Sequence, residues 1–217
     1  MATLLAVSAG TPRPDGKGAV TGIHKRPVAG PVTLRDPGDR LEGLGSGVVG
    51  DAVCDRRHHG GRDQAVYAVS AAELAHWSGV LGRGLTPGTF GENLTTEGLD
   101  VDEALVGEVW AVGDTARLQV TGPRIPCATF ARAMGEPQWV KRFSERGRTG
   151  AYLRVLTPGE VRAGDPIVVE SRPAHDLTVP EMFRALTTER ERLPRLRVVE
   201  DLGEEGRRAL AAYLARE

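Results

Sequence analysis

Cys127 ends a stiff corner of the sequence, and its thiol is the group best suited to chemistry. The corner reads PRIPC from residue 123, and its two prolines remove backbone donors and restrict the turn, which holds the thiol at a set position. Arg124 lies just before it, and a nearby positive charge lowers the pKa of a thiol and favours the thiolate, which bonds metals or acts as a nucleophile. A small buried side chain is the alternative interpretation and stays open.

Three further stretches combine glycines with polar side chains. Residues 58–64 (HHGGRDQ) precede an apolar run, and their paired glycines would let the backbone approach a ligand closely. Residues 88–94 (GTFGENL) place Asn93, which can donate and accept hydrogen bonds, after two glycines. Residues 147–152 (GRTGAY) put Arg148 in a turn, where its guanidinium could bind the oxygens of a phosphate. Each stretch taken alone is also typical of a surface turn.

Composition and motifs argue against several other functions. The 217 residues hold 28 Lys and Arg against 29 Asp and Glu, so no broad cationic surface exists and we expect no stable nucleic-acid complex. The sequence has no G-x-x-x-x-G-K-S/T loop, no G-x-G-x-x-G turn and no G-x-S-x-G elbow, which removes support for nucleotide folds and acyl hydrolases. Cys54, His58, His59 and Cys127 are zinc-ligand types, but the spacing of Cys54 and His58 matches no standard zinc pattern.

The start of the chain predicts a strand rather than a targeting segment. MATLLAVSAG has no basic flank and no long apolar stretch. No window approaches the about 20 apolar residues that cross a bilayer. The two cysteines, Cys54 and Cys127, are expected to be free thiols. We therefore expect a cytoplasmic protein that does not enter membranes.

Short apolar runs bounded by turn residues predict a mainly β fold. The chain contains 28 Gly and 14 Pro, and the runs between them have strand length and are rich in valine. The predicted strands cover residues 4–7, 65–69, 106–112, 118–120, 151–156 and 167–169. Many short strands with frequent turns are typical of a barrel or a sandwich.

Capping signals predict a few helices between and after the strands. Residues 70–73 (SAAE) have capping-box form and open a helix through residue 77. A second helix is expected over residues 138–143, with Val140 and Phe143 on one face. A linker at residues 171–174 then leads to a tail of two or three short helices, which begin with a capping box at residues 178–181 and end with a segment from about 204 to 216.

Taken together and in this order, the polar stretches resemble the MOSC domain family, named for the C-terminal domain of molybdenum cofactor sulfurase, and within it the stand-alone bacterial branch called YiiM-like. The resemblance covers nearly the whole chain, including the helical tail. It rests on five motifs: Thr21-Gly22-Ile23-His24-Lys25, His59-Gly60-Gly61-x-Asp63-x-Ala65-Val66-Tyr67, Gly88-x-Phe90-Gly91-Glu92-Asn93-Leu94, Pro123-Arg124-x-Pro126-Cys127 and Gly147-Arg148-Thr149-Gly150-x-Tyr152.

The resemblance implies a fold and a cofactor. It implies a strongly curved β-barrel, like the small domain of pyruvate kinase, over residues 1–172, with short inserted helices and a small C-terminal helical module over residues 173–217. It also implies a molybdenum cofactor, a pterin whose dithiolene sulfurs hold the metal together with one protein thiolate, here Cys127. The candidates to neutralise the pterin phosphate are Lys25, Arg124 and Arg148, and those to bond the pterin edge or oxo groups are His59, Asn93 and Tyr152.

Related members reduce N-hydroxylated compounds, such as hydroxylaminopurine bases, to amines, so the resemblance implies an oxidoreductase. Cys127 would be catalytic as the metal ligand, and His59 would be catalytic as a proton donor, because histidine is a common general acid. Because the sequence has no flavin, haem or iron–sulfur motif, a separate reductase protein is expected to supply the electrons. The alternative is a non-redox module that carries the cofactor or sulfur on Cys127. Pyridoxal phosphate binding and a homodimer through the apolar stripe of the tail also stay open.

Overall fold

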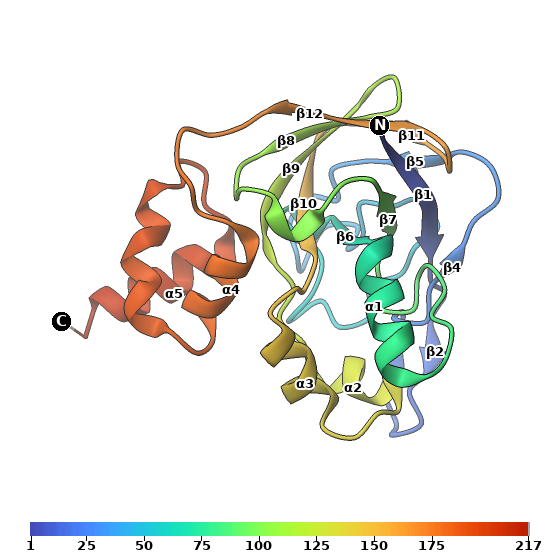
Figure 1. Ribbon diagram of the computed structural model, residues 1–217, viewed down its shortest axis with the longest axis horizontal. Coiled ribbons are helices and arrows are strands. Elements are labelled where there is room, and N and C mark those ends of the chain that lie inside the picture. Colours follow the sequence, from blue (N-terminus) through green and yellow to red (C-terminus); the bar gives the residue numbers. More distant parts are fainter. Residues whose placement is uncertain (217) are drawn as a thin grey trace.

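Seven strands close into a barrel, which confirms the mainly β fold expected from the sequence (Figure 1). The computed structural model describes residues 1–216. The barrel strands are β1 (Ala2–Ala9), β6 (Val66–Ser70), β7 (Leu94–Glu97), β8 (Val109–Val112), β9 (Ala116–Pro123), β10 (Ala151–Thr157) and β12 (Pro166–Ser171). They hydrogen-bond in the order β12-β8-β9-β10-β6-β7-β1, and β1 pairs again with β12. Only the pair β6 and β7 is parallel within this ring.

Short strands and turns extend the barrel at its edges. Strand β4 (Arg26–Pro27) pairs with the end of β1, and β5 (Val32–Leu34) pairs with β11 (Gly159–Val161). Strands β2 (Arg13–Pro14) and β3 (Val20–Thr21) form a separate hairpin. Two short 3-10 helices, η1 (Arg62–Gln64) and η2 (Val101–Glu103), lie in the connections before β6 and before β8.

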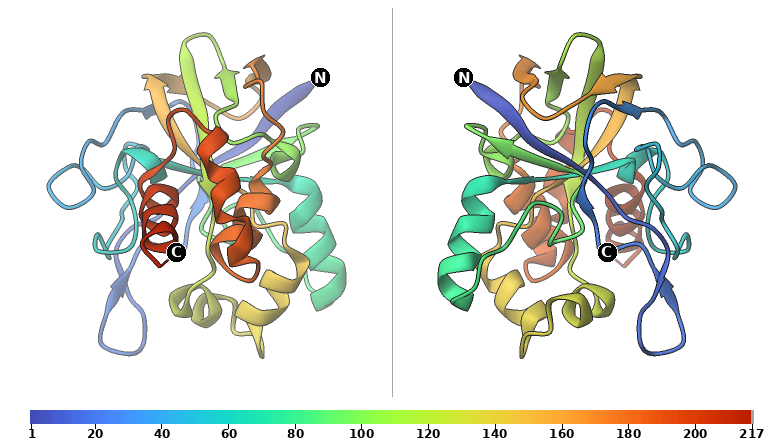
Figure 2. Two further views of the ribbon diagram at one scale, coloured as in Figure 1. Left: turned by 90° about the vertical axis from the view of Figure 1, so that its left-hand side faces the viewer. Right: turned by 90° about the vertical axis from the view of Figure 1, so that its right-hand side faces the viewer.

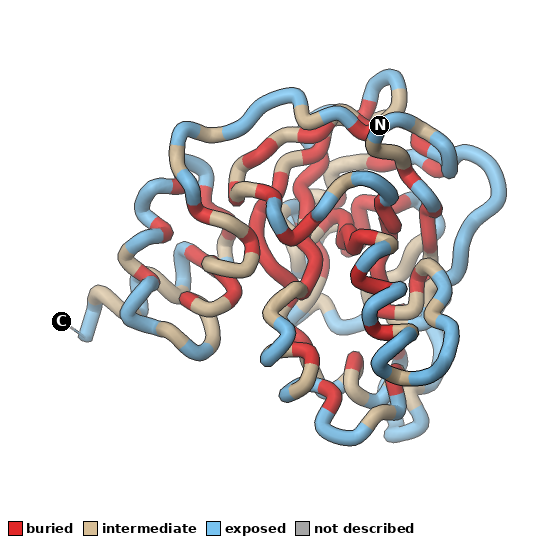
Figure 3. The backbone as a smooth tube through the Cα atoms, in the orientation of Figure 1, coloured by how far each residue is buried: buried red, intermediate tan, exposed pale blue. Residues whose placement is uncertain are grey.

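Aliphatic side chains from alternate strand positions fill the barrel. Strand β8, for example, buries Trp110 and Val112, while its other two residues, at the alternate positions, are half-buried. Buried stretches of backbone are concentrated in the strands (Figure 3). The valines and leucines of the apolar runs, which lie between turns in the sequence, thus form one continuous core.

Three helices cover one end of the barrel with aromatic side chains (Figure 1). Helix α1 (Ala71–Leu81) begins as predicted, because Ser70 accepts a hydrogen bond from the backbone of Glu73 at 3.3 Å. Helix α3 (Trp139–Arg146) is also confirmed, but it buries Trp139 with Phe143, whereas Val140 is exposed.

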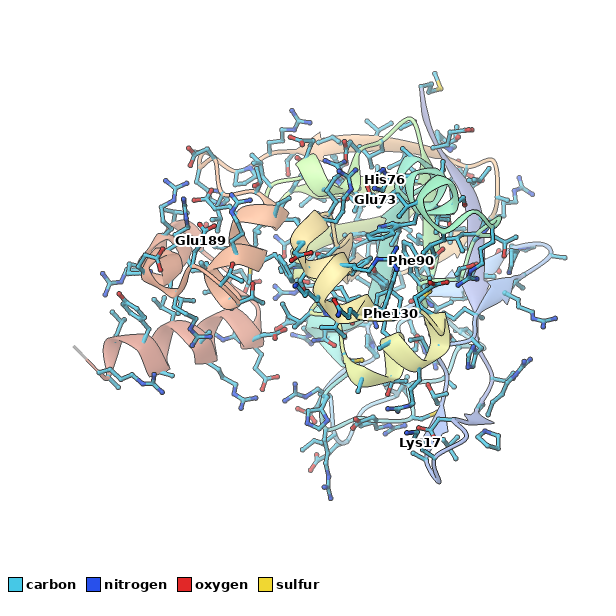
Figure 4. All side chains as sticks on the ribbon, turned by 60° about the horizontal axis from the view of Figure 1, so that its bottom comes forward. Lys17, Glu73, His76, Phe90, Phe130 and Glu189 are labelled. Carbon is cyan, nitrogen blue, oxygen red and sulfur yellow. The ribbon has the colours of Figure 1, made fainter. Side chains whose placement is uncertain are left out.

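Helix α2 (Ala128–Met134), which starts directly after Cys127, is an element that the sequence patterns did not predict. It packs Phe130 against Phe90, with ring centroids 5.6 Å apart and a near-perpendicular arrangement. Figure 4 shows these two rings close together beneath α2 and α3. The aromatic cluster therefore fixes α2 to the loop that carries Phe90.

The C-terminal residues form a helical module beside the barrel (Figures 1 and 2). It consists of α4 (Val179–Leu186), η3 (Arg190–Val198) and α5 (Glu204–Leu214). Thr178 caps α4 by accepting the backbone N–H of Glu181, as the capping box predicted. The module has its own cluster of buried residues, to which the barrel segment adds Val106. Within residues 1–216, no helix is both long and apolar enough to span a membrane.

Asp63 of the barrel holds the first turn of α5. Its Oδ2 accepts the backbone N–H of Glu204 at 2.7 Å, and its Oδ1 accepts from the buried Arg154 guanidinium at 2.5 Å. Gly203 stands at the N-cap of α5 and has no side chain to offer there. Asp63 therefore supplies from another part of the chain the cap that the helix lacks.

Replacing Asp63 tests this attachment. Asp63→Ala should lower the free energy of unfolding by about 1–3 kcal/mol, because it removes a helix cap and one carboxylate partner of a buried guanidinium. The same variant should speed amide exchange at residues 204–207 more than within the barrel strands. Denaturant unfolding and hydrogen exchange measure both effects. Glu200→Ala, an exposed change in the same module, is the control and should stay within about 0.5 kcal/mol.

Candidate functional site

The corner after β9 opens onto a cleft of about 580 Å³. Cys127 stands at the N-cap of α2, directly after the Pro123–Pro126 corner, and its side chain is half-buried at the cleft wall. Six of the seven predicted site residues line this cleft: Lys25, His59, Asn93, Arg124, Cys127 and Tyr152. Segments distant in the sequence thus meet around one thiol.

The surroundings of Cys127 favour its thiolate. Burial by itself raises the pKa of the thiol, but the polar contact with His59, the charge of Arg124 and the backbone N–H of Phe130 outweigh it and lower the pKa from 9.0 to about 6. For Cys54, in contrast, burial and the charge of Asp51 raise the pKa above 9.0. The two cysteines therefore differ in reactivity, and Cys127 is the one with a nucleophilic or metal-binding sulfur at neutral pH.

Arg124 is a buried cation without a carboxylate partner in the described chain. Only 5% of its surface is exposed. Its guanidinium lies over the rings of Phe130 and Tyr67, at 4.4 and 5.2 Å from their centroids, and Nη1 donates to the carbonyl of Phe90 at 3.4 Å. Nε has no partner among residues 1–216. The Cys127 sulfur is the one anionic partner of this guanidinium among residues 1–216. Because Nε is left without a partner, the arrangement indicates a site for a further anionic group.

Lys25 also lines the cleft, but its charge is already paired. Its Nζ lies 2.5 Å from Oδ2 of Asp51, which also accepts from the Ser46 hydroxyl and the Asn93 amide at 2.7 and 3.0 Å. Burial lowers the pKa of the Lys25 ammonium, and the Asp51 carboxylate opposes that shift. Lys25 therefore has less positive charge to offer a phosphate than the sequence suggested. The sequence analysis missed Asp51, which follows a glycine-rich segment and belongs to no motif.

Asn93 joins three strands rather than presenting a free amide. Its side chain donates to the carbonyl of Ser8 at 3.1 Å and accepts the backbone N–H of Tyr67 at 3.2 Å, in addition to its contact with Asp51. These bonds occupy both ends of the amide. Asn93 thus lies at the cleft but holds β1, β6 and the segment before β7 together.

The structure does not bring Arg148 to the cleft. Its guanidinium binds the carboxylates of Glu73 and Asp100, at 3.2 and 2.5 Å, near the start of α1. Glu73 is buried and also accepts two hydrogen bonds from Arg146. These acidic groups already accept the hydrogen bonds that the Arg148 guanidinium donates. Arg148 is therefore not available to bind a phosphate, which is the role that the sequence analysis expected for it.

The paired glycines serve the protein backbone rather than a ligand. Gly60 and Gly61 have positive φ angles of 84° and 76°. A Cβ on Gly60 would lie 2.6 Å from the carbonyl oxygen of Gly45, and one on Gly61 would lie 2.7 Å from Cα of Arg40. The glycines thus let residues 40–45 of the protein, rather than a ligand, come close to the backbone at residues 60 and 61. The neighbouring residue, His59, contacts Cys127.

Comparison with known families fits this geometry. The family model described as "MOSC domain" matches residues 55–168, which include His59, Asn93, Arg124, Cys127 and Tyr152. The chain belongs to the MOSC domain family. Domains of this family are associated with the molybdenum cofactor.

Three similar proteins extend the comparison. YflK of Bacillus subtilis (strain 168) is 35% identical over 180 residues, which are 82% of this chain and 77% of YflK. A protein named reductase from Gibberella moniliformis (strain M3125 / FGSC 7600) is 30% identical over 84% of this chain, but this MOSC protein spans only 32% of that longer protein. The crystal structure of YiiM from Geobacillus stearothermophilus has a TM-score of 0.79 and 26% identity, and covers 99% of this chain and 100% of that one.

The residues at the cleft fit the cofactor that the family implies. Cys127 offers a soft thiolate, the ligand type suited to such a metal. Arg124 offers a buried guanidinium whose Nε lacks a partner, which suits an anionic group at the same wall. His59 and Tyr152 line the cleft beside them. The fit between the cleft and the cofactor thus rests on Cys127 and Arg124. The side chains of Lys25 and Asn93 are already bound to other groups of the protein.

The difference between the two thiols predicts two alkylation profiles. In a Cys54→Ser variant, iodoacetamide should modify Cys127 with a midpoint near pH 6, and the rate should fall below it as the thiolate gains a proton. In a Cys127→Ser variant, Cys54 should react with a midpoint above 9.0. Adding His59→Ala to the Cys54→Ser variant should move the Cys127 midpoint upward by about one unit, since a stabilising contact is lost. Identical profiles for the two cysteines would contradict this assignment.

Proposed function

We propose that this protein is a molybdenum-dependent oxidoreductase that reduces N-hydroxylated compounds, such as hydroxylaminopurine bases, to amines. The observation that carries the proposal is the Cys127 sulfur, which faces an open cleft beside a buried guanidinium whose Nε has no partner among residues 1–216. When bound, the molybdenum cofactor would supply the two-electron redox chemistry that reduction of an N–O bond requires. Cys127 would hold the metal, and Arg124 would bind an anionic group of the cofactor.

The protons of the reaction require a donor at the cleft. Conversion of R–NHOH to R–NH2 and water consumes two electrons and two protons, so a group that exchanges protons near neutral pH must reach the substrate. His59 lines the cleft and contacts the Cys127 sulfur, and an imidazole has the ordinary pKa for this task. The electrons would come from a separate reductase protein that docks transiently.

Removing the thiol tests the proposal directly. Cys127→Ser, expressed in a host that makes the cofactor, should lose molybdenum and pterin and all reduction of N-hydroxylated bases with reduced benzyl viologen as donor. Cys54→Ser is the matched control and should keep both. Metal analysis and the viologen assay together separate the alternatives. Molybdenum without turnover in the wild type would favour the carrier module, and a Cys127→Ser variant that retains metal and activity would refute the ligand assignment.

The two arginines should respond differently to substitution. Arg124→Met should lower molybdenum content about 10- to 100-fold, because the cation beside the metal ligand is lost. It should leave the free energy of unfolding within about 1 kcal/mol, since no carboxylate loses its partner.

Arg148→Met provides the contrast. It should keep the molybdenum content of the wild type but destabilise the fold by about 1–3 kcal/mol, because the buried Glu73 loses one of its two arginine partners and keeps Arg146. Metal analysis and denaturant unfolding of both variants measure the difference. Loss of metal only in Arg148→Met would overturn the assignment of Arg124.

A further inference from the structure

The hairpin of β2 and β3 forms part of the wall of the Cys127 cleft. Four residues of the hairpin line this cleft, namely Asp15, Ala19, Val20 and Thr21. Apart from Asp15, residues 13–20 are exposed to solvent. Figures 1 and 2 show the hairpin extending away from the barrel on the side of α2. The hairpin therefore separates this part of the cleft from the surrounding water.

Helix α2, which begins directly after Cys127, contributes another part of the same wall. Thr129 and Arg132 of this helix line the cleft. Asp15 and Arg132 are 117 residues apart in the chain, yet Nη2 of Arg132 donates to Oδ2 of Asp15 at 2.8 Å. The ion pair thus joins the hairpin to the helix that carries the thiol at its N-cap.

Both ends of this ion pair are held in place by bonds within their own segments. Oδ1 of Asp15 accepts the backbone N–H groups of Lys17 and Ala19 at 2.8 and 3.0 Å. Nη2 of Arg132 also donates to Oγ1 of Thr129 at 3.0 Å. Only 5% of the Asp15 side chain is exposed, against 34% of the Arg132 side chain. The covered carboxylate and the half-exposed guanidinium place the pair at the rim of the cleft, where its lining meets solvent.

The hairpin has few other attachments. Among the hydrogen bonds and ion pairs of residues 1–216, the one between Asp15 and Arg132 is the only one that connects residues 13–20 to a distant part of the chain. The other bonds of these residues lie within the hairpin, such as the backbone bond from Asp15 to Ala19 at 2.8 Å. Because a single, partly exposed ion pair is weak in water, an attachment of this kind opens and closes readily.

We propose that the β2–β3 hairpin is a gate over the Cys127 cleft and that the ion pair between Asp15 and Arg132 is its latch. With the latch closed, the hairpin is held against α2 and narrows the route to the thiol. With the latch open, the hairpin moves away from α2 and admits a bulkier molecule. Asp15 and Arg132 thus limit the size of the molecules that reach Cys127. The gate acts on access alone, so it does not depend on the reaction proposed for the cleft.

Alkylation of Cys127 by a small and a bulky maleimide tests the gate. The test uses a Cys54→Ser parent protein, in which Cys127 is the remaining thiol. N-ethylmaleimide and N-(1-pyrenyl)maleimide share one reactive group and carry no charge, so removing a charged side chain affects them differently only through access. Each rate is divided by the rate of the same reagent with glutathione. In the parent protein, the corrected rate should be lower for the pyrenyl reagent than for the ethyl reagent.

Opening the latch should accelerate the bulky reagent selectively. Asp15→Asn keeps an oxygen for the backbone N–H groups of the turn but removes the charge that holds Arg132, and Arg132→Gln removes the cation. Each variant should raise the pyrenyl rate about three- to fivefold and change the ethyl rate by less than about twofold. The double variant should show the same increase as either single variant, because all three lose one interaction. Glu170→Gln is the matched control, since it breaks the 2.7 Å ion pair with Arg117 outside the cleft lining.

Four results would overturn the gate or its latch. Equal corrected rates of the two reagents in the parent protein would show that the hairpin does not restrict access. A pyrenyl rate that is unchanged in both single variants would show that the ion pair does not hold the hairpin. Equal acceleration of both reagents would indicate general loosening around the thiol. Increases that add in the double variant would show that Asp15 and Arg132 act independently.

Discussion

The guanidinium of Arg124 lies between two aromatic rings at the base of the cleft, and the arrangement of the site depends on how its charge is accommodated. No carboxylate in the described chain pairs with it, so its stabilisation comes from the π faces of Tyr67 and Phe130, one carbonyl and the Cys127 sulfur. The same charge lowers the pKa of Cys127. This buried cation therefore contributes to the thiolate, together with the His59 contact and the backbone N–H of Phe130, and its free Nε suits an anionic group.

Two other predicted cations, Lys25 at the cleft and Arg148 away from it, are paired with carboxylates, which distinguishes the buried Arg124 from them. Asp51 forms an ion pair with Lys25 and accepts hydrogen bonds from Ser46 and Asn93. Arg148 forms ion pairs with acidic side chains near α1. These pairs hold the loops in place without changing the charge available to a ligand. The cleft thus combines a polar frame of paired groups with a buried cation, Arg124, whose Nε still lacks a partner among residues 1–216.

The barrel and the helical module contribute differently to this frame. Closure of the seven strands fixes the corner that carries Cys127, and the aromatic cluster fixes α2 behind it. The module attaches through Asp63, in the same short segment as His59. Because one loop both contacts the thiol and caps α5, the position of the module and the geometry of the site are mechanically connected.

Local patterns were sufficient for most elements and for the centre of the site. Valine-rich runs marked six of the seven barrel strands, capping boxes marked α1 and α4, and the proline corner marked Arg124 and Cys127. Strand β7 escaped because its sequence, LTTE, contains no valine and one aliphatic side chain, and α2 escaped because its N-cap residue makes no capping hydrogen bond. Val140 was assigned to the buried face of α3 that Trp139 in fact occupies.

The sequence alone thus determined the chemical types at the site, because the proline corner marks Arg124 and Cys127 and the glycine-rich turn marks His59. Only the tertiary structure decided which charges are free, because Asp51 reaches Lys25 and Glu73 reaches Arg148 across long stretches of chain. Pairing between distant charges is a property of packing, and no local pattern encodes it.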